Sequence, residues 1–289
     1  MGSLRNFLRT ELLPDGLSYF DYQYSVARDV LIPWLDPHVS LAGLAVGDFG
    51  CHQGGVLQGL REVAGIGSGI GFDVDEASIR RSPFEPNARF RLVLGDISEV
   101  DAAHYKFDLI LLRDVLEHTR DPVAILEKAR ACLTQRGRVF VSFPPFYSPF
   151  GGHQHEMSSG VRFLPFIHYL PDVLLYSLSR FRETPYMSAE STRADIKSVR
   201  QTRLTLSKAE RVFDRAGLRI EMQEFFLFRP EFRIRYGLSS WQIPLVHRVP
   251  IVREIATLGA FYLLAPKGLN GEHGSGSAIC TRASIAARS

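Results

Sequence analysis

The chain has 289 residues, enough to bury a full hydrophobic core as one large domain or as one domain with an insertion. Apolar residues make up 45% and charged residues 22%, which excludes an intrinsically disordered chain. The net charge of +3 is small, so we expect no nucleic-acid partner. Cys51, Cys132 and Cys280 form no zinc or disulfide pattern, which favours a reducing, cytoplasmic setting.

Two apolar stretches, 163–178 and 243–264, were candidates for membrane spans. Both contain prolines or charged residues, and neither reaches the roughly 18 uninterrupted apolar residues that a spanning helix needs. We therefore predict no transmembrane segment. Peripheral membrane contact stays open for the first stretch, and the sequence does not indicate an oligomeric state.

In chain order, residues 1–40 carry apolar residues near helical spacing and predict an N-terminal helical cap. Residues 41–143 alternate short apolar strands with helices, which predicts a core for cofactor binding. The expected strands are 44–46, 70–72, 89–94, 107–112 and 138–143, and the expected helices are 56–63 and 122–133.

Residues 144–203 interrupt this alternation with aromatics, prolines and a polar tail, and we predict that they form a lid insertion at the acceptor site. Residues 204–266 complete the sheet with a helix, for which Ser207 is the expected N-cap and Gly217 the C-cap, and strands at 218–223 and 259–265. We predict a disordered tail at 267–289. The fold class is α/β: a Rossmann-like, doubly wound, mostly parallel seven-stranded sheet with helices on both faces.

Ligands of such sheets bind at the carboxyl ends of the strands. The first strand is followed by a glycine turn with Asp48, Gly50 and Gly54, whose backbone N–H groups can approach a ligand closely. Asp73 ends the second strand and can accept hydrogen bonds from both hydroxyls of a ribose. Asp96, which ends the third, can accept from the amino group of an adenine. Taken singly, each of these has an ordinary structural explanation.

In combination they resemble the class I S-adenosylmethionine-dependent methyltransferases of the methyltransferase-11/23 type. The resemblance covers residues 41–143 and, more weakly, 205–265, and includes the run from Phe107 to Ile110 that leads to Val115-Leu116-Glu117-His118. It implies S-adenosylmethionine as cofactor. The cofactor-binding residues that we predict are Asp48, Gly50, Cys51, His52, Gly54, Asp73, Val74, Asp96, Ile97, Arg113 and Asp114.

One residue departs from the family pattern. His52 stands where the family usually has glycine, at a point where the backbone nears the methionine moiety. Its β-carbon crowds the ligand, or a shifted loop accommodates it, or its ring contacts the methionine carboxylate. A nicotinamide-dependent dehydrogenase is excluded because the turn does not supply G-x-G-x-x-G.

Transfer to a hydroxyl requires a base near the acceptor. We predict His118, His153 and His155 as catalytic residues: His118 follows the fourth strand, and the other two follow the fifth. As an alternative, Glu117-His118 begins the helix that follows. His153, His155 and Glu156 also leave a metal site open, but a base or an acceptor-binding role is favoured and we predict no metal ligands.

The identity of the methyl acceptor depends on the insertion. Its apolar residues predict a partly apolar acceptor. Alternatively, these residues form only a second small core. For Arg229, Arg233 and Arg235 we favour a solvated basic strand edge over an anion site. The leading function is O-methylation of a small acceptor such as a specialised metabolite, glycan or lipid-like molecule. The alternatives are C- or N-methylation, or a non-catalytic binding or regulatory protein with a degenerate fold.

Overall fold

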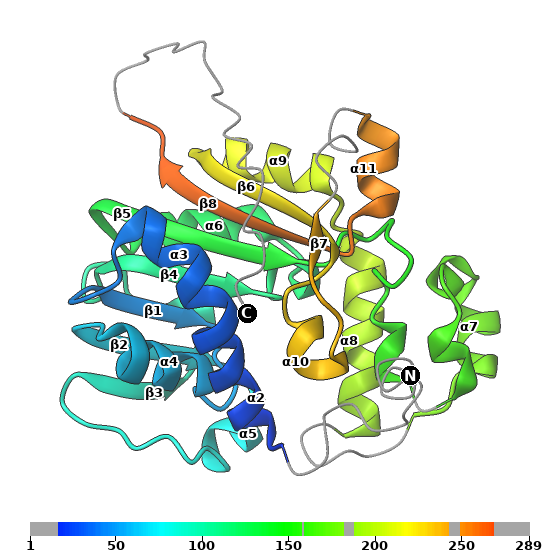
Figure 1. Cartoon of the computed structure of the whole chain (residues 1–289), viewed down its shortest axis with the longest axis horizontal. Helices are drawn as coiled ribbons and strands as arrows, with labels where there is room; N and C mark the ends of the chain where they lie inside the picture. Colours follow the sequence, from blue (N-terminus) through cyan, green and yellow to red (C-terminus); the bar gives the residue numbers. More distant parts are fainter. Residues whose placement is uncertain (1–16, 158, 182–187, 243–248, 269–289) are drawn as a thin grey trace.

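The computed structural model describes residues 17–157, 159–181, 188–242 and 249–268, and these include one mixed sheet of eight strands in the order β3-β2-β1-β4-β5-β8-β6-β7 (Figure 1). The pairs from β3 to β5 are parallel, whereas β8 runs antiparallel to both β5 and β6. The strands are β1 (Ala45–Phe49), β2 (Ser68–Asp73), β3 (Phe90–Leu94), β4 (Phe107–Arg113), β5 (Leu133–Phe143), β6 (Leu218–Phe228), β7 (Trp241–Gln242) and β8 (Gly259–Pro266).

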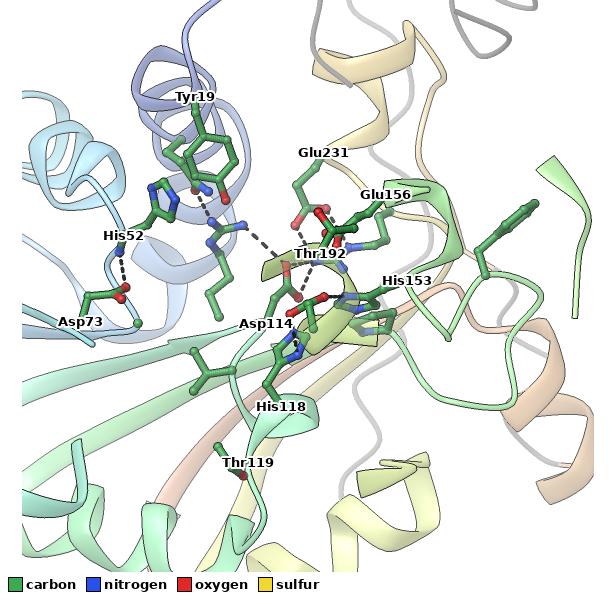
Figure 2. A pocket seen from close by; sticks show the side chains of 18 of the residues that line it. Tyr19, His52, Asp73, Asp114, His118, Thr119, His153, Glu156, Thr192 and Glu231 are labelled. Atoms are coloured by element: carbon green, nitrogen blue, oxygen red, sulfur yellow. Dashed lines mark hydrogen bonds and ion pairs between the residues drawn. The ribbon is translucent and has the colours of Figure 1, made fainter. Parts of the chain in front are cut away.

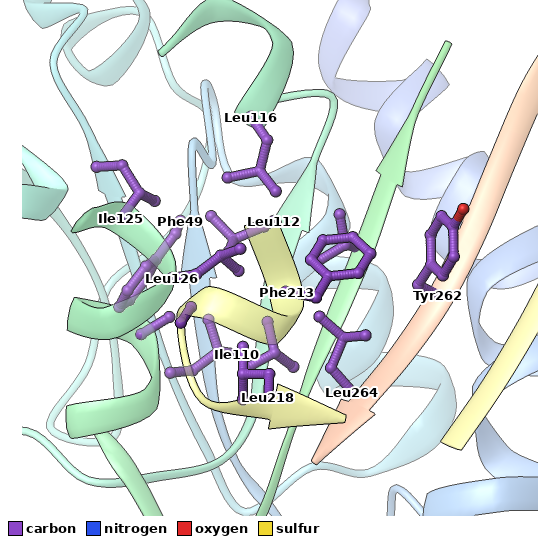
Figure 3. Close-up of a cluster of buried hydrophobic side chains, with 14 of the residues drawn as sticks. Phe49, Ile110, Leu112, Leu116, Ile125, Leu126, Phe213, Leu218, Tyr262 and Leu264 are labelled. Atoms are coloured by element: carbon purple, nitrogen blue, oxygen red, sulfur yellow. The ribbon is translucent and has the colours of Figure 1, made fainter. Parts of the chain in front are cut away.

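Successive residues of the buried strands face opposite sides of the sheet and fill two separate cores. Ile110 and Leu112 of β4 face the side that is covered by α6 (Pro122–Ala131) and α9 (Leu206–Arg215), the core drawn in Figure 3. Leu109 and Leu111 face the other side, with α2 (Tyr19–Val26), α3 (Ile32–Val39) and α4 (Gly55–Gly59). The predicted doubly wound α/β class is therefore confirmed, and the two-residue β7 adds an eighth strand at one edge.

At the N-terminal side, Tyr19–Val39 is helical, while residues 1–16 lie outside the described part of the chain. The helix passes from α2 through a π-helical turn, η1 (Ala27–Leu31), into α3 without a break. Pro33 therefore does not interrupt this helix. Since proline removes one helical hydrogen bond and crowds the preceding turn, the wider turn just before Pro33 accommodates the ring.

The remaining helical elements are short, apart from α8. They are η2 (Leu60–Ala64), α5 (Glu76–Arg80), η3 (Ile97–Glu99), η4 (Leu116–His118), η5 (Gln154–Glu156), η6 (Gly160–Phe163), η7 (Ile167–Tyr169), α7 (Asp172–Leu178), α8 (Ala189–Thr202), α10 (Phe232–Tyr236) and α11 (Pro250–Ala256). Among the described residues, no helix is both long and apolar enough to cross a membrane.

The insertion after β5 is mostly helical and has a small core of its own, made by Met157, Ile167, Leu175 and Ile196. The polar tail of the insertion, for which the sequence predicted no regular structure, forms α8. The N-cap residue of this helix, Ser188, accepts a hydrogen bond from the Ser191 N–H. Thr192, Ile196 and Val199 are buried at helical spacing along α8. Figure 1 shows α8 between the sheet and the outer helix α7, so this helix joins the insertion to the rest of the fold.

One detail of the second half corrects a prediction from the sequence. Helix α9 is capped by Thr205, whose hydroxyl accepts from the Lys208 N–H, and not by Ser207. Gly217 follows the helix with a φ of 73°, as expected of a C-terminal glycine. The tail that was predicted to be disordered lies outside the described residues from 269 onward.

Candidate active site

A cavity of about 810 Å³ lies at the carboxyl ends of the parallel strands, between the sheet, α2 and the insertion. This is the edge at which doubly wound sheets bind their ligands, and the volume suits a small molecule or a pair of them. Figure 2 shows Tyr19, His52 and Asp73 on one side of the cavity and His118, His153 and Glu156 on the other. We call these sides the strand-end half and the lid half.

The strand-end half begins with the turn after β1. The backbone N–H groups of Gly50 and Cys51 both donate to the Phe72 carbonyl, at 2.8 and 3.1 Å, which ties this turn to the end of β2. Gly50 has a φ of 87°, and a Cβ there would lie 2.5 Å from Cγ2 of Val115. Only glycine therefore fits this turn without moving the segment that follows β4.

Asp48 lies behind the turn, where it is 3% exposed. Its Oδ2 has no hydrogen-bond partner among the described residues, and burial raises the pKa of this carboxyl to about 7. A buried polar atom without a partner is costly, and a bound ligand that donates to it would remove this cost. The carboxylate is therefore available to a donor that approaches through the turn.

Two further acids follow β2 and β3 and line the cavity. Asp73 accepts from the backbone N–H groups of His52, at 2.6 Å, and Asp75, at 2.9 Å, so its carboxylate is held in one orientation. Asp96 caps η3 by accepting from the Ser98 N–H at 2.7 Å. This hydrogen bond and one from the Ser98 hydroxyl lower the pKa of the Asp96 carboxyl.

His52 takes the left-handed backbone conformation that a glycine adopts freely, with a φ of 50°. Its ring packs at 4.4 Å, centroid to centroid, against Tyr19, and its Nε2 lies 2.8 Å from the hydroxyl of Ser78. Ser78 donates to Asp75, so His52 Nε2 is the donor in that contact. The histidine is thus accommodated, with its ring forming part of the cavity wall.

Buried charges separate the two halves. Arg229, after β6, donates through Nη2 to both carboxylate oxygens of Asp114 at 2.9 Å, and to Glu231 at 3.1 Å. Burial opposes the ionised form of Asp114, but Arg229 and Arg113 outweigh it and hold the pKa of Asp114 below its usual range. Arg229 is 9% exposed, so the prediction of a solvated basic edge is wrong for this residue.

The lid half is built around Asp195 of α8. Its two carboxylate oxygens lie 2.9 Å from Nδ1 of His118 and 3.0 Å from Nδ1 of His153. Burial opposes ionisation of Asp195, but the two histidines outweigh it and lower its pKa. Burial likewise favours neutral His118, yet Asp195 raises the pKa of this histidine to about 9. One carboxylate therefore fixes two imidazole rings.

Two more acids complete this group. Glu117 is 1% exposed, and its Oε1 lies 4.0 Å from Nε2 of His118 and 3.8 Å from Nε2 of His153. Burial raises its pKa to about 8. Burial, followed by the negative charge of Asp195, also raises the pKa of Glu156 to about 8. The alternative that Glu117-His118 begins the next helix is wrong, because α6 begins at Pro122 with Asp121 as its N-cap.

The local chain path that carries His153 requires small residues. A Cβ on Gly152 would lie 2.1 Å from Cβ of His168, and one on Gly151 would lie 2.1 Å from the Pro145 carbonyl oxygen. His168 is buried, and its Nε2 donates to the Phe146 carbonyl at 2.8 Å. The glycine pair thus lets the segment pass over His168 and turn His153 toward α8.

The cavity brings together most of the site residues predicted from sequence. Those that line it are Gly50, His52, Asp73, Val74, Asp96, Ile97, Arg113, Asp114, His118 and His153. Asp48, Cys51 and Gly54 lie outside its lining, and Cys51 packs with its sulfur against Gly71. His155 belongs to η5, but its side chain lies outside the described part of the chain. Individual roles stay predictions.

Sequence reasoning missed Asp195, the paired role of Arg229 and Glu231, and the contribution of Tyr19 and Gln23 from α2 to the cavity wall. A signal existed for Asp195. Ser188 followed by apolar or small residues at 192, 196 and 199 has the spacing of a capped amphipathic helix. That pattern would have placed Asp195 on a helix but not opposite His118.

Comparison with known proteins relates part of the chain, with residues from both halves of the cavity, to known methyltransferases. Residues 48–139 match a family model described as a methyltransferase domain. A ubiquinone biosynthesis O-methyltransferase of Stutzerimonas stutzeri is 30% identical over 117 residues, covering 38% of this chain and 49% of that protein. A tRNA U34 carboxymethyltransferase of Campylobacter fetus is 31% identical over 112 residues, covering 37% of this chain and 39% of that protein. The chain therefore spans about half, or less, of the length of these curated relatives.

Solved structures extend the likeness to most of the chain. The plantazolicin methyltransferase BpumL, in complex with a monoazolic desmethylPZN analog and SAH, aligns with a TM-score of 0.52 and 14% identity over 86% of this chain and 85% of that one. Its complex with a pentazolic analog and SAH aligns with a TM-score of 0.51 and 15% identity, covering 87% and 86%. At these identities the likeness concerns the fold, which is that of Rossmann-like methyltransferases.

Proposed function

We propose that the chain transfers the methyl group of S-adenosylmethionine to a hydroxyl of a small, partly apolar acceptor, because residues 48–139 match a methyltransferase domain. The observation that carries the proposal is the division of one cavity. The acids that follow β2 and β3 line one half, and the histidines with buried carboxyl groups line the other. Cofactor and acceptor would thus occupy neighbouring halves.

The strand-end residues fit the proposed cofactor. The Gly50 turn leaves no room for a side chain, and Asp48 behind it has an Oδ2 for which the described structure offers no donor. Asp73 would accept from the ribose hydroxyls, and Asp96 and Ile97 would hold the adenine. When bound, S-adenosylmethionine supplies a methyl group that its sulfonium already activates, so the protein's task is mainly to align the acceptor.

The lid half supports a hydroxyl acceptor because its groups can take up a proton. Burial raises the pKa of Glu117 and of Glu156 to about 8, so these carboxyls exchange protons near neutral pH. Phe150 and Phe163 from the insertion and Phe228 beside Arg229 line the cavity and favour an acceptor with apolar surface. The similarity to ubiquinone biosynthesis O-methyltransferases points the same way.

A second candidate is modification of RNA, which is favoured only by the similarity to the tRNA carboxymethyltransferase. The aromatic lining of the lid half and the small net charge of +3 favour a small molecule. C- or N-methylation would use the same cofactor half, and a non-catalytic binding protein would keep the fold alone. The cysteine pattern still leads us to expect a reducing compartment such as the cytoplasm.

Calorimetric titration with S-adenosylmethionine and S-adenosylhomocysteine tests the cofactor. We expect saturable binding of both by the full chain. No heat of binding at millimolar ligand would contradict the enzyme proposal and favour the non-catalytic alternative. Methyl transfer from radiolabelled cofactor to panels of hydroxylated aromatic compounds and of tRNA then separates the two acceptor classes.

A further inference from the structure

Four side chains of the lid half form one ordered group: His118, His153, Glu117 and Asp195. Their mutual orientation is more specific than a general base alone would need. The histidine rings lie 4.9 Å apart, centroid to centroid, at an angle of 69°. Both rings turn Nδ1 toward Asp195 and Nε2 toward Oε1 of Glu117. Three segments meet here, namely η4 after β4, the start of η5 in the insertion, and α8. Figure 2 shows His118 and His153 side by side at this point of the cavity.

Hydrogen bonds fix the tautomer of His118. The Ser198 hydroxyl donates to the Asp195 backbone carbonyl at 2.7 Å, so it can only accept from Nδ1 of His118, 3.0 Å away. Nδ1 of His118 therefore carries a proton, which it also directs at the ionised Asp195. In a neutral ring the lone pair is then on Nε2, and it points toward Glu117. His153 presents the same ring orientation to the same carboxylate.

Glu117 gives a second, independent observation. It is 1% exposed, and neither of its carboxylate oxygens receives a hydrogen bond from another described residue. Burying a carboxyl group without hydrogen-bond partners is costly in either protonation state. A cation between Glu117 Oε1 and the two Nε2 atoms would remove this cost.

We propose that His118 Nε2, His153 Nε2 and a carboxylate oxygen of Glu117 bind one divalent transition-metal ion, and that Asp195 positions both histidines. Metal-binding histidines commonly donate their second ring N–H to a carboxylate, which fixes the ring and its tautomer. Asp195 does this for both rings at once. The second possible grouping, His153 with Glu156 and Asp195, would break these hydrogen bonds and is therefore disfavoured.

The distances suit this assignment. With metal–nitrogen and metal–oxygen bonds of about 2.0–2.1 Å, two ligand atoms of a tetrahedral ion are roughly 3.4 Å apart. The separations of 3.8 and 4.0 Å from Glu117 Oε1 to the two Nε2 atoms exceed that by about half an ångström. All three ligand atoms lie within 4.8 Å of one another, so binding of the ion would draw these side chains closer together. Two imidazoles favour zinc or a neighbouring transition metal over magnesium, which prefers oxygen ligands.

The position of the bound ion would restrict the kinds of acceptor molecule that the cavity can bind. Three protein ligands leave a coordination position open, as at catalytic rather than structural sites. His118 and His153 line the cavity, so this position would face the acceptor and select one with an oxygen donor. The metal site does not depend on the proposed methyl transfer, because binding of the ion is measured without cofactor.

Cobalt(II) is the probe, since its visible absorption reports the ligand set, whereas zinc is silent. We expect untagged, chelator-treated full chain to bind one equivalent of Co²⁺, which Zn²⁺ displaces and excess Mg²⁺ does not. Glu117→Gln should weaken Co²⁺ binding at least about 100-fold, and Asp195→Asn about 10–100-fold. Asp172→Asn is the matched control, because this exposed carboxylate lies in the same insertion and pairs with Arg200. Its affinity should be unchanged.

His118→Cys gives a test that gains a signal. A cysteine thiolate at the metal adds a sulfur-to-cobalt charge-transfer band, which appears only if residue 118 is a ligand. Near-ultraviolet circular dichroism verifies the fold of each variant. The proposal is overturned if the wild-type chain binds no stoichiometric Co²⁺, if folded Glu117→Gln binds it as tightly, or if folded His118→Cys binds Co²⁺ without the new band. Calorimetry with S-adenosylhomocysteine on the same samples reports the methyltransferase proposal separately.

Discussion

The two halves of the cavity are built in different ways. In the strand-end half, neighbouring parallel strands and backbone hydrogen bonds position the side chains: Asp73 is fixed by two backbone N–H groups, and Gly50 by the carbonyl of Phe72. In the lid half, buried charges hold together segments that are far apart in sequence, as Asp195 does for His118 and His153. From this difference we expect substitutions in the two halves to affect different properties of the protein. Changes in the first half should cost affinity, and changes to the buried charges should cost folding.

The largest effect on stability is expected at Arg229, between the halves. Arg229→Met removes the nearest cation from Asp114 and from the buried Glu231, and leaves Asp114 with only Arg113, at 3.6 Å. Breaking a buried ion pair costs about 3–5 kcal/mol, and we expect such a loss in the free energy of unfolding. Urea denaturation measures it. Arg233→Met is the control, because this exposed side chain on α10 should change stability by less than about 0.5 kcal/mol. Equal effects would show that the network does not hold the halves together.

A large effect on affinity is expected at Asp73. Asp73→Ala removes the proposed acceptor of two ribose hydrogen bonds to a charged group, each contributing about 1.5–3 kcal/mol. Affinity for S-adenosylhomocysteine should therefore fall roughly 100-fold or more in calorimetry. Asp101→Ala replaces an exposed carboxylate outside the cavity lining and should leave the affinity unchanged. If Asp73→Ala bound as tightly as the wild type, Asp73 would lose its assigned role.

A smaller, pH-dependent effect is expected at His168, which supports the insertion. Burial lowers the pKa of His168 to about 4, whereas in the unfolded chain it is near 6.5. The unfolded state then binds the proton more readily, so stability that is present above pH 6.5 is lost as the pH falls toward 4. At pH 5 the loss of stability relative to neutral pH amounts to about 2 kcal/mol.

His168→Gln keeps a donor for the Phe146 carbonyl and cannot titrate, so its stability should depend less on pH than that of the wild type. Denaturation at about pH 7.5 and about pH 5 measures the difference, with the exposed His104→Gln as control. Identical pH dependence of the wild type and His168→Gln would show that the insertion is not sensitive to this buried ring.

The same contrast between the two halves explains which site residues could be predicted from the sequence. Strand ends are local: each acid or glycine stands directly after an apolar run, so Gly50, Asp73 and Asp96 were found without a structure, and the sheet with them. Asp195 and Arg229 act through partners 77 and 115 residues away in the chain, and the local sequence does not indicate those partners. Arg229 lies in a charged stretch that reads as a solvated edge, and only the packing of β6 beside β8 buries it. His118 was identified, but its relation to His153 needed the path of the insertion.

The central claim is that the strand-end half binds the cofactor, and hydrogen exchange tests it most directly. With saturating S-adenosylhomocysteine, we predict slower amide exchange in the turns at residues 50–54, 73–75 and 95–98, and unchanged exchange in α7, which lies on the outer side of the insertion (Figure 1). Unchanged exchange in all three turns, or protection confined to the insertion, would contradict the account.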